Sequence, residues 1–289
     1  MVRENLNNKE RIVIFGKYKS LIGILSDGSN LNSSNNLPGI LLLNSGLIHR
    51  VGPSRIYVKL SRYLAEKGFN VLRFDLSGIG DSTNLQANRP LAESVVEDTI
   101  EAMDYLGDKH GISRFVLIGI CDGASISLKA ACHDKRVKSL VLVNLWVPDT
   151  LESKKMTTMN FYWRAAFFRR QSWLKFISGK SSYRELFGAM WYKLKGYLLP
   201  RERISEKSDE VSLDFHKSFQ LLNNYNTRLL IISSGIDIGS DFLKAKISDL
   251  VKEMSLSGQL QMEHIPFSDH TFTSLNAQSE LIELIKKWL

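Results

Sequence analysis

Short apolar runs alternate with helical patterns along most of the chain, and this alternation constrains the fold more than any other feature. The run ILLLN (40–44) is continuously apolar, which is typical of a strand buried on both faces. A helix is expected after it, because Pro53 suits a helix start, apolar residues recur at helical spacing and Gly68 suits a helix end. Strands separated by helices imply a mostly parallel central sheet flanked by helices, so the pattern predicts an α/β fold.

The same alternation continues towards the end of the sequence. Strands are expected at 11–15, 21–25, 40–44, 70–74, 114–118, 137–144, 228–233 and 260–265. Further helices are expected at about 91–107, 122–132, 241–254 and 275–288. In such sheets, functional groups gather beyond the carboxyl ends of the strands, and the loops after these runs are therefore the places to look for a site.

The composition fits a globular protein of a reducing compartment. The chain has 289 residues, of which 44% are apolar and 24% charged, and no run approaches the roughly 18 apolar residues of a membrane span. The first ten residues, MVRENLNNKE, lack the apolar core of a secretory signal. Cys121 and Cys132 fall about 11 residues, or about 16 Å, apart on one predicted helix, so both should be free thiols. We therefore expect a cytoplasmic protein.

The net charge of +8 is carried by one segment. Residues 148–203 contain twelve Lys or Arg against four acids, together with twelve aromatic residues. A basic, aromatic stretch could bind nucleic acid, a membrane surface or an anionic ligand. It could equally be an amphipathic helical segment with inward aromatics and solvated charges, and this second interpretation is preferred because charge patterning alone does not determine function.

The sequence Gly119-Ile120-Cys121-Asp122-Gly123 lies between a predicted strand and a predicted helix. This is the G-x-nucleophile-x-G spacing of a nucleophile elbow, with Cys where Ser usually stands. The nucleophile sits on a strained turn, and a side chain at either glycine would collide with neighbouring backbone. The helix N-terminus would also stabilise a thiolate. The alternative is a buried structural cysteine, but the strand-to-helix context favours the elbow.

A cysteine nucleophile needs a base that is oriented by a third group, and downstream residues supply both in the usual chain order. Among six histidines, His270 follows the last predicted strand and is the expected base. Asp237 follows the strand at 228–233 and is the expected acid. Asp241 is a less favoured candidate, because it could instead be a helix-start residue.

The expected oxyanion hole combines the backbone N–H of Asp122 with one from the loop after ILLLN, for which Leu47 is the preferred donor. In the same loop, His49 and Arg50 could hold an anionic substrate group, or they could be solvated loop residues; both interpretations stay open. No cluster of His, Cys or carboxylates has metal-ligand spacing, so no metal and no redox cofactor is expected.

The elbow, acid and histidine together resemble the α/β-hydrolase superfamily over nearly the whole chain. More narrowly, the stretches NSGLIHRVGPSRIYVKLSRYLAEKGFNVLRFDLSGIGDS, GICDGAS and LVLVNLWV resemble the exosortase-system-associated hydrolases of bacteria. The resemblance implies an α/β-hydrolase fold with core parts at 1–147 and 216–289 and a helical lid at 148–215, inserted after the sixth main strand. Trp163 and Arg169 of this lid are then expected to contact the substrate.

Cys in place of Ser departs from the commonest superfamily pattern, although dienelactone hydrolases and polyhydroxyalkanoate synthases share it. We therefore expect an enzyme that cleaves an ester or thioester through an acyl-cysteine, with acyl-CoA or an acyl-carrier protein as a possible donor and no nucleic-acid partner. An acyltransferase with the same three residues is the alternative, and a non-catalytic ligand-binding protein is the third hypothesis. The sequence leaves the acyl group, the acceptor and the oligomeric state open.

Overall fold

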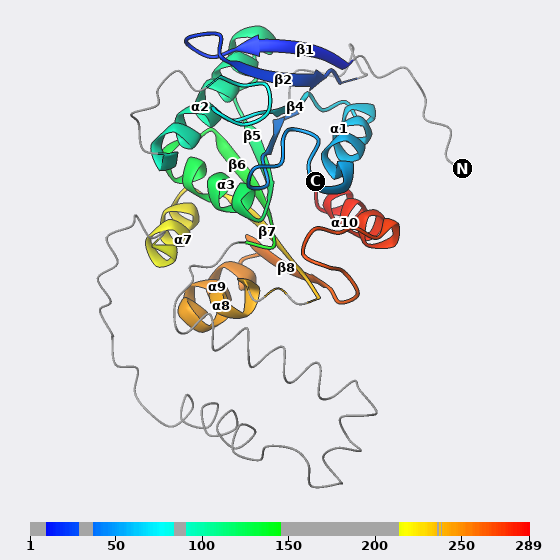
Figure 1. The fold of residues 1–289 in the computed structure, drawn as a ribbon. Helices are drawn as coiled ribbons and strands as arrows, with labels where there is room; N and C mark the ends of the chain where they lie inside the picture. Colours follow the sequence, from blue (N-terminus) through cyan, green and yellow to red (C-terminus); the bar gives the residue numbers. More distant parts are fainter. Residues whose placement is uncertain (1–9, 29–36, 84–90, 146–213, 236, 238) are drawn as a thin grey trace, which may run out of the picture. The chain divides into compact units, whose positions relative to one another are not determined.

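The computed structural model describes residues 10–28, 37–83, 91–145, 214–235, 237 and 239–289. These residues form one eight-stranded sheet with the strand order β1-β2-β4-β3-β5-β6-β7-β8 (Figure 1). β1 pairs antiparallel with β2 and β2 antiparallel with β4, whereas all other neighbours are parallel. The strands are β1 (Glu10–Phe15), β2 (Leu21–Ser26), β3 (Gly39–Leu43), β4 (Val71–Phe74), β5 (Phe115–Ile120), β6 (Val137–Val143), β7 (Arg228–Ser234) and β8 (Leu260–Ile265).

Helices cover both faces of the sheet. α1 and α10 lie on one face, and α2, α3 and α7 lie on the other (Figure 1). The helices are the 3-10 turn η1 (Pro53–Arg55), α1 (Ile56–Glu66), α2 (Leu91–His110), α3 (Asp122–His133), α7 (Phe215–Asn224), α8 (Gly239–Lys246), α9 (Ser248–Leu256) and α10 (Leu275–Trp288). Within the described part of the chain, no helix combines the length and the apolar character that crossing a membrane requires.

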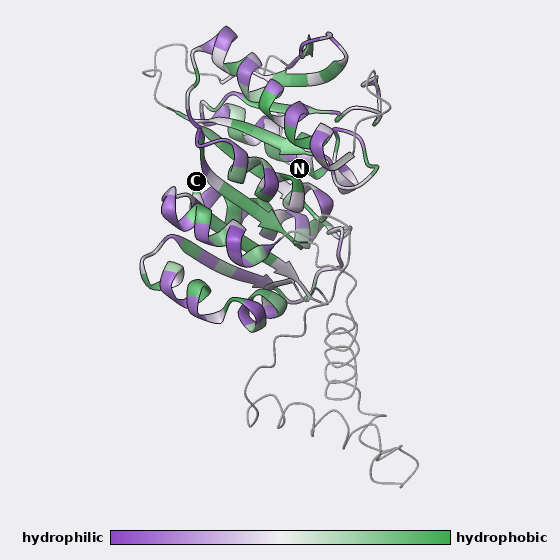
Figure 2. Ribbon diagram, turned by 90° about the vertical axis from the view of Figure 1, so that its left-hand side faces the viewer, coloured by the Kyte–Doolittle hydropathy of each residue, from purple (hydrophilic) through white to green (hydrophobic). Residues whose placement is uncertain are grey.

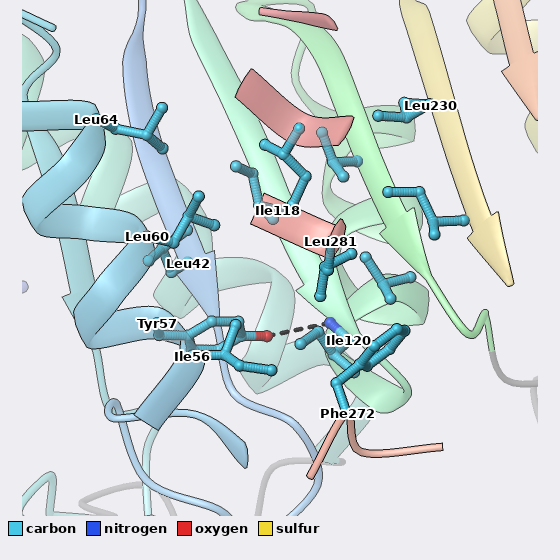
Figure 3. Packing of buried hydrophobic residues seen from close by; sticks show 14 of the residues in the cluster. Leu42, Ile56, Tyr57, Leu60, Leu64, Ile118, Ile120, Leu230, Phe272 and Leu281 are labelled. Atoms are coloured by element: carbon cyan, nitrogen blue, oxygen red, sulfur yellow. Dashed lines mark hydrogen bonds between the residues drawn. The ribbon is translucent and has the colours of Figure 1, made fainter. Parts of the chain in front are cut away.

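The central strands are apolar on both faces, as the run at 40–44 predicts. All five residues of β3 and all six of β5 are buried, and hydrophobic colour concentrates on these strands while the helices carry both kinds of residue (Figure 2). Alternate strand residues, among them Leu42 and Ile118, pack in one cluster with Tyr57 and Leu60 of α1 and Leu281 of α10 (Figure 3). This cluster lies directly behind the turn that carries Cys121.

Two helix predictions are corrected. The helix expected at about 241–254 is two helices, because Ile247 leaves helical geometry (φ −132°, ψ 42°) while its β-branched side chain is buried. The helix expected from Pro53 begins as a 3-10 turn, and Ser54 and Arg55 take positive φ values of 48° and 61° before α1 starts. Regular α-helix therefore begins at Ile56. The predicted helix at 91–107 exists and continues to His110.

Candidate active site

Cys121 occupies a strained turn between β5 and α3. Its φ of 57° and ψ of −118° are unusual for a residue with a side chain, and it is the N-cap of α3. A Cβ added at Gly119 would lie 2.1 Å from the carbonyl carbon and oxygen of Gly123, and one at Gly123 would lie 2.6 Å from the Leu43 oxygen. The predicted reason for both glycines is thereby confirmed, since either side chain would overlap backbone.

Tyr57 supports this turn from behind, and the sequence analysis did not single it out. Its hydroxyl donates to the Leu43 carbonyl (2.7 Å) and accepts the N–H of Ile120 (3.1 Å), the residue before Cys121 (Figure 3). The side chain is completely buried, and burial raises the pKa of Tyr57. The sequence does indicate that Tyr57 is buried, because it shares the helical spacing of Leu60 and Leu64. That spacing does not indicate that its hydroxyl makes hydrogen bonds.

His270 and Asp237 meet at the carboxyl ends of β8 and β7. Nδ1 of His270 lies 3.5 Å from Oδ2 of Asp237, and the side chains are 42% and 11% exposed. The other carboxylate oxygen, Oδ1, accepts the N–H of Gly239 (2.8 Å). Hydrogen bonding to Asp237 first, and to Cys121 second, raises the pKa of His270 to about 10 against the opposing effect of burial. The structure therefore brings Cys121, His270 and Asp237 together.

The two predicted oxyanion donors lie on adjacent loops. Leu47 belongs to a tight turn in which the Ile48 N–H donates to the Ser45 carbonyl (3.1 Å), and Gly46 of this turn has a φ of 56°. A Cβ at Gly46 would lie 3.1 Å from Oδ2 of Asp122. As the first residue of α3, Asp122 has a backbone N–H without a partner inside the helix. The Leu47 side chain itself is 90% exposed.

Arg50 does not have the free guanidinium that a substrate-binding role needs. Its Nη1 is ion-paired with the fully buried Asp75, and its Nη2 contacts Asp81 at 2.6 Å. The backbone N–H of Arg50 also donates to Asp75 (2.6 Å). Arg50 is not a solvated loop residue either. Its bonds to Asp75 connect the loop after β3 to the loop after β4. His49 is exposed.

The remaining predicted substrate contacts belong to the expected lid. Trp163, Arg169 and the expected lid at 148–215, apart from its last two residues, lie outside the described residues. Cys132 is a free thiol, as is Cys121. Burial raises the pKa of Cys132, whose sulfur lies 3.9 Å from the Ser218 carbonyl. Among the described residues, no group of three or more His, Cys, Asp or Glu side chains is arranged to hold a metal ion.

Comparison with known sequences gives a partial match. A family model described as the alpha/beta hydrolase fold matches residues 39–172. Human protein ABHD12B is 30% identical over 118 residues, which cover 38% of this chain and 31% of that protein. The chain thus spans about a third of the length of this curated relative.

Solved structures match over the full length. An alpha-beta serine hydrolase homologue from Coxiella burnetii aligns with a TM-score of 0.57 at 16% identity, covering 100% of this chain and 99% of that chain. An esterase from Pyrococcus furiosus aligns with a TM-score of 0.56 at 14% identity, covering 100% and 94%. Identities this low speak for the fold alone. Together with the strand order and the family model, they establish that the chain has the α/β-hydrolase fold, and the predicted fold is confirmed.

Proposed function

We propose that the protein is a hydrolase that cleaves an ester or thioester through an acyl-cysteine at Cys121. One observation carries the proposal: a cysteine in a strained turn at a helix N-terminus shares a site with a histidine whose Nδ1 is 3.5 Å from a carboxylate. A nucleophile, a base and a group that orients the base are the parts that acyl transfer needs. The esterase and serine hydrolase homologue among the structural neighbours support the same reaction class.

The chemistry follows from the three side chains. The Cys121 thiolate attacks the acyl carbon and forms a C–S bond, while the backbone N–H groups of Leu47 and Asp122 stabilise the oxyanion. The bond to the leaving group then breaks, and His270 donates a proton to the departing oxygen or sulfur. In the second half, His270 accepts a proton from water, the hydroxide attacks the acyl-cysteine, and the acid leaves with the thiolate restored. Asp237 orients the His270 ring throughout and stabilises it whenever it is charged.

A thioester is the preferred substrate class, because exchange of an acyl group between two thiols is nearly thermoneutral. Acyl-CoA and acyl-carrier proteins are the natural donors of this kind, and an acyltransferase would use the same first half-reaction. We place the enzyme in the cytoplasm, because two cysteines are too few for a disulfide framework and agree with a reducing compartment.

Intact-mass spectrometry tests the proposal. The protein is incubated with a panel of acyl-CoAs and activated esters, and we expect one acyl adduct on the wild type and on Cys132→Ala, but none on Cys121→Ala. Decay of the adduct in water alone identifies a hydrolase, whereas decay only after addition of an amine or alcohol identifies a transferase. If no donor gives an adduct and none is consumed while the protein binds the donors, the chain is a binding protein and the proposal is wrong.

A further inference from the structure

Asn144 lies directly after β6, between the strands that lead to Cys121 and to Asp237 (Figure 1). It is completely buried and has a φ of 48°, a backbone conformation that Asn adopts more readily than most residues with a side chain. Its backbone N–H donates to the Ile232 carbonyl of β7 (2.8 Å). The preceding residue, Val143, accepts the N–H of Cys121 (2.9 Å). This short segment therefore contacts the backbone of the nucleophile turn as well as β7.

The side-chain amide of Asn144 joins the other two loops of the candidate site. Its Nδ2 donates to the backbone carbonyl of His270 (2.7 Å). Its Oδ1 accepts the N–H of Ser234 (2.7 Å), the last residue of β7. The Ser234 carbonyl in turn accepts the N–H of Asp237 (3.1 Å). One neutral amide thus spans the loop that carries the base and the turn that carries the acid.

Asn144 uses both the NH₂ group and the oxygen of its amide, and few other side chains offer a donor and an acceptor so close together. The amide supplies a donor and an acceptor at the same time, whereas an ionised carboxylate of the same size supplies acceptors only. Glycine accepts the backbone conformation but offers neither group. The bond to Ser234 is buried and the bond to His270 is partly buried, so water does not replace a lost partner easily.

We propose that Asn144 is a positioning residue that holds the backbone of His270 at a fixed distance from the turn of Asp237, and thereby keeps the imidazole against the carboxylate. The inference rests on the proposed function for its consequence in catalysis. The positioning role itself does not depend on that function. At a separation of 3.5 Å between Nδ1 and Oδ2, a small shift of either loop would already break the contact between His270 and Asp237.

Asn44 provides a matched control. It directly follows β3 and is 1% exposed, and its amide likewise makes two bonds to backbone: Nδ2 donates to the Ile48 carbonyl (3.0 Å) and Oδ1 accepts the N–H of Leu76 (2.9 Å). These partners belong to the loops after β3 and β4, away from His270 and Asp237. Asn44→Gly and Asn144→Gly therefore each remove an amide with two bonds to backbone, but only Asn144→Gly removes one from the histidine loop.

Two measurements on the full chain test the inference without any substrate. The first is the titration of the His270 imidazole by NMR, with its resonance identified from His270→Gln. The second is the pH dependence of Cys121 alkylation by iodoacetamide in the Cys132→Ala background. In Asn144→Gly we expect the pKa of His270 to fall by at least about one unit towards its ordinary value, and alkylation at neutral pH to slow by up to about 100-fold. In Asn44→Gly both should match the parent, despite a similar loss in melting temperature.

Equal effects of the two glycine variants would indicate general loosening and overturn the inference, as would an Asn144→Gly protein with an unchanged His270 titration. If Asn144→Gly does not fold, Asn144→Asp carries the test, since Asp tolerates the same backbone and keeps the acceptor for Ser234. Above the pKa of that carboxyl it loses the donor to His270 and adds a negative charge, which by itself would raise the pKa of His270, so a fall in that pKa is the result expected from the lost donor. The proposed function fails separately, when the wild type neither forms an acyl adduct nor consumes any donor.

Discussion

The carboxylate of Asp237 is held from two sides: Oδ2 lies 3.5 Å from Nδ1 of His270, and Oδ1 accepts the Gly239 N–H at 2.8 Å. A carboxylate oriented in this way can fix the tautomer of the imidazole and stabilise its charged form. Asp241, the less favoured candidate from the sequence, instead lies in the first turn of α8. The two acids therefore differ in what they should contribute.

Asp237→Asn should lower kcat by roughly 10²–10⁴, at or below the loss that a wrong tautomer causes in a serine-protease triad. A thiol depends less on the acid than a hydroxyl does, because it ionises more easily. Asp241→Asn should cost only about 0.3–1 kcal/mol of stability, through the loss of a charge at a helix start. Rates are compared at equal folded fraction, checked by thermal melts. An inactive Asp241→Asn protein beside an active Asp237→Asn protein would reverse the assignment.

Gly119→Ala should destabilise the protein by about 3 kcal/mol or more, because its Cβ would lie 2.1 Å from backbone atoms of Gly123. Gly258→Ala is the control, since that site has a φ of 75° and open space around the added methyl group. There only backbone strain of about 1–2 kcal/mol is expected. Urea denaturation measures both. Equal costs would mean that the elbow can open to admit a side chain.

Arg50→Gln should cost about 3 kcal/mol, because it leaves the fully buried carboxylate of Asp75 without its guanidinium partner. Arg11→Gln breaks an exposed pair with Asp27 and should cost less than about 1 kcal/mol. Denaturation curves at one pH and salt concentration compare the two. An Arg50→Gln protein of wild-type stability with a raised KM for an anionic substrate would instead support the substrate-binding role that the sequence left open.

The stability of the folded protein should fall as the pH rises from about 6.5 to about 10. His270 has a folded-state pKa raised to about 10, so its contribution is fully present below the ordinary value near 6.5 and disappears through the higher one. His270→Gln lacks this pH-dependent contribution to stability. The difference in unfolding free energy between the wild type and His270→Gln should therefore shrink as the pH rises from about 6.5 to about 10. A difference that stays constant with pH would show that His270 carries no raised pKa.

The fold could be predicted largely from local patterns. The runs that became β3 and β5 are apolar throughout, and β6 and β7 each contain an apolar run (140–143 and 229–232), because both faces of these strands are covered; such runs are visible in sequence. The break at Ile247 was not predictable from the same rule, since apolar residues keep helical spacing across it. It depends on where the Ile247 side chain is buried, which is a tertiary property.

The residues of the candidate site also fall into two groups, those that local sequence patterns reveal and those that depend on distant contacts. Cys121, Asp237 and His270 are found from glycine spacing and from their positions after strands, both of which are local. Asn144 and Tyr57 act through hydrogen bonds to backbone atoms that are distant in sequence, and a buried Asn or Tyr looks the same in sequence whether or not it makes them. The ion pair of Arg50 was not predictable for a related reason, because its partner Asp75 follows another strand.

The placement of His270 after β8 has a consequence for the newly made chain. Cys121 precedes His270 by about 150 residues, so at about 5–20 residues per second a ribosome makes the nucleophile roughly 7–30 s before the base. During that interval the thiol is present but the imidazole that would pair with it is not. On the proposed mechanism, a thiolate paired with the His270 imidazolium therefore arises only once β8 has docked beside β7.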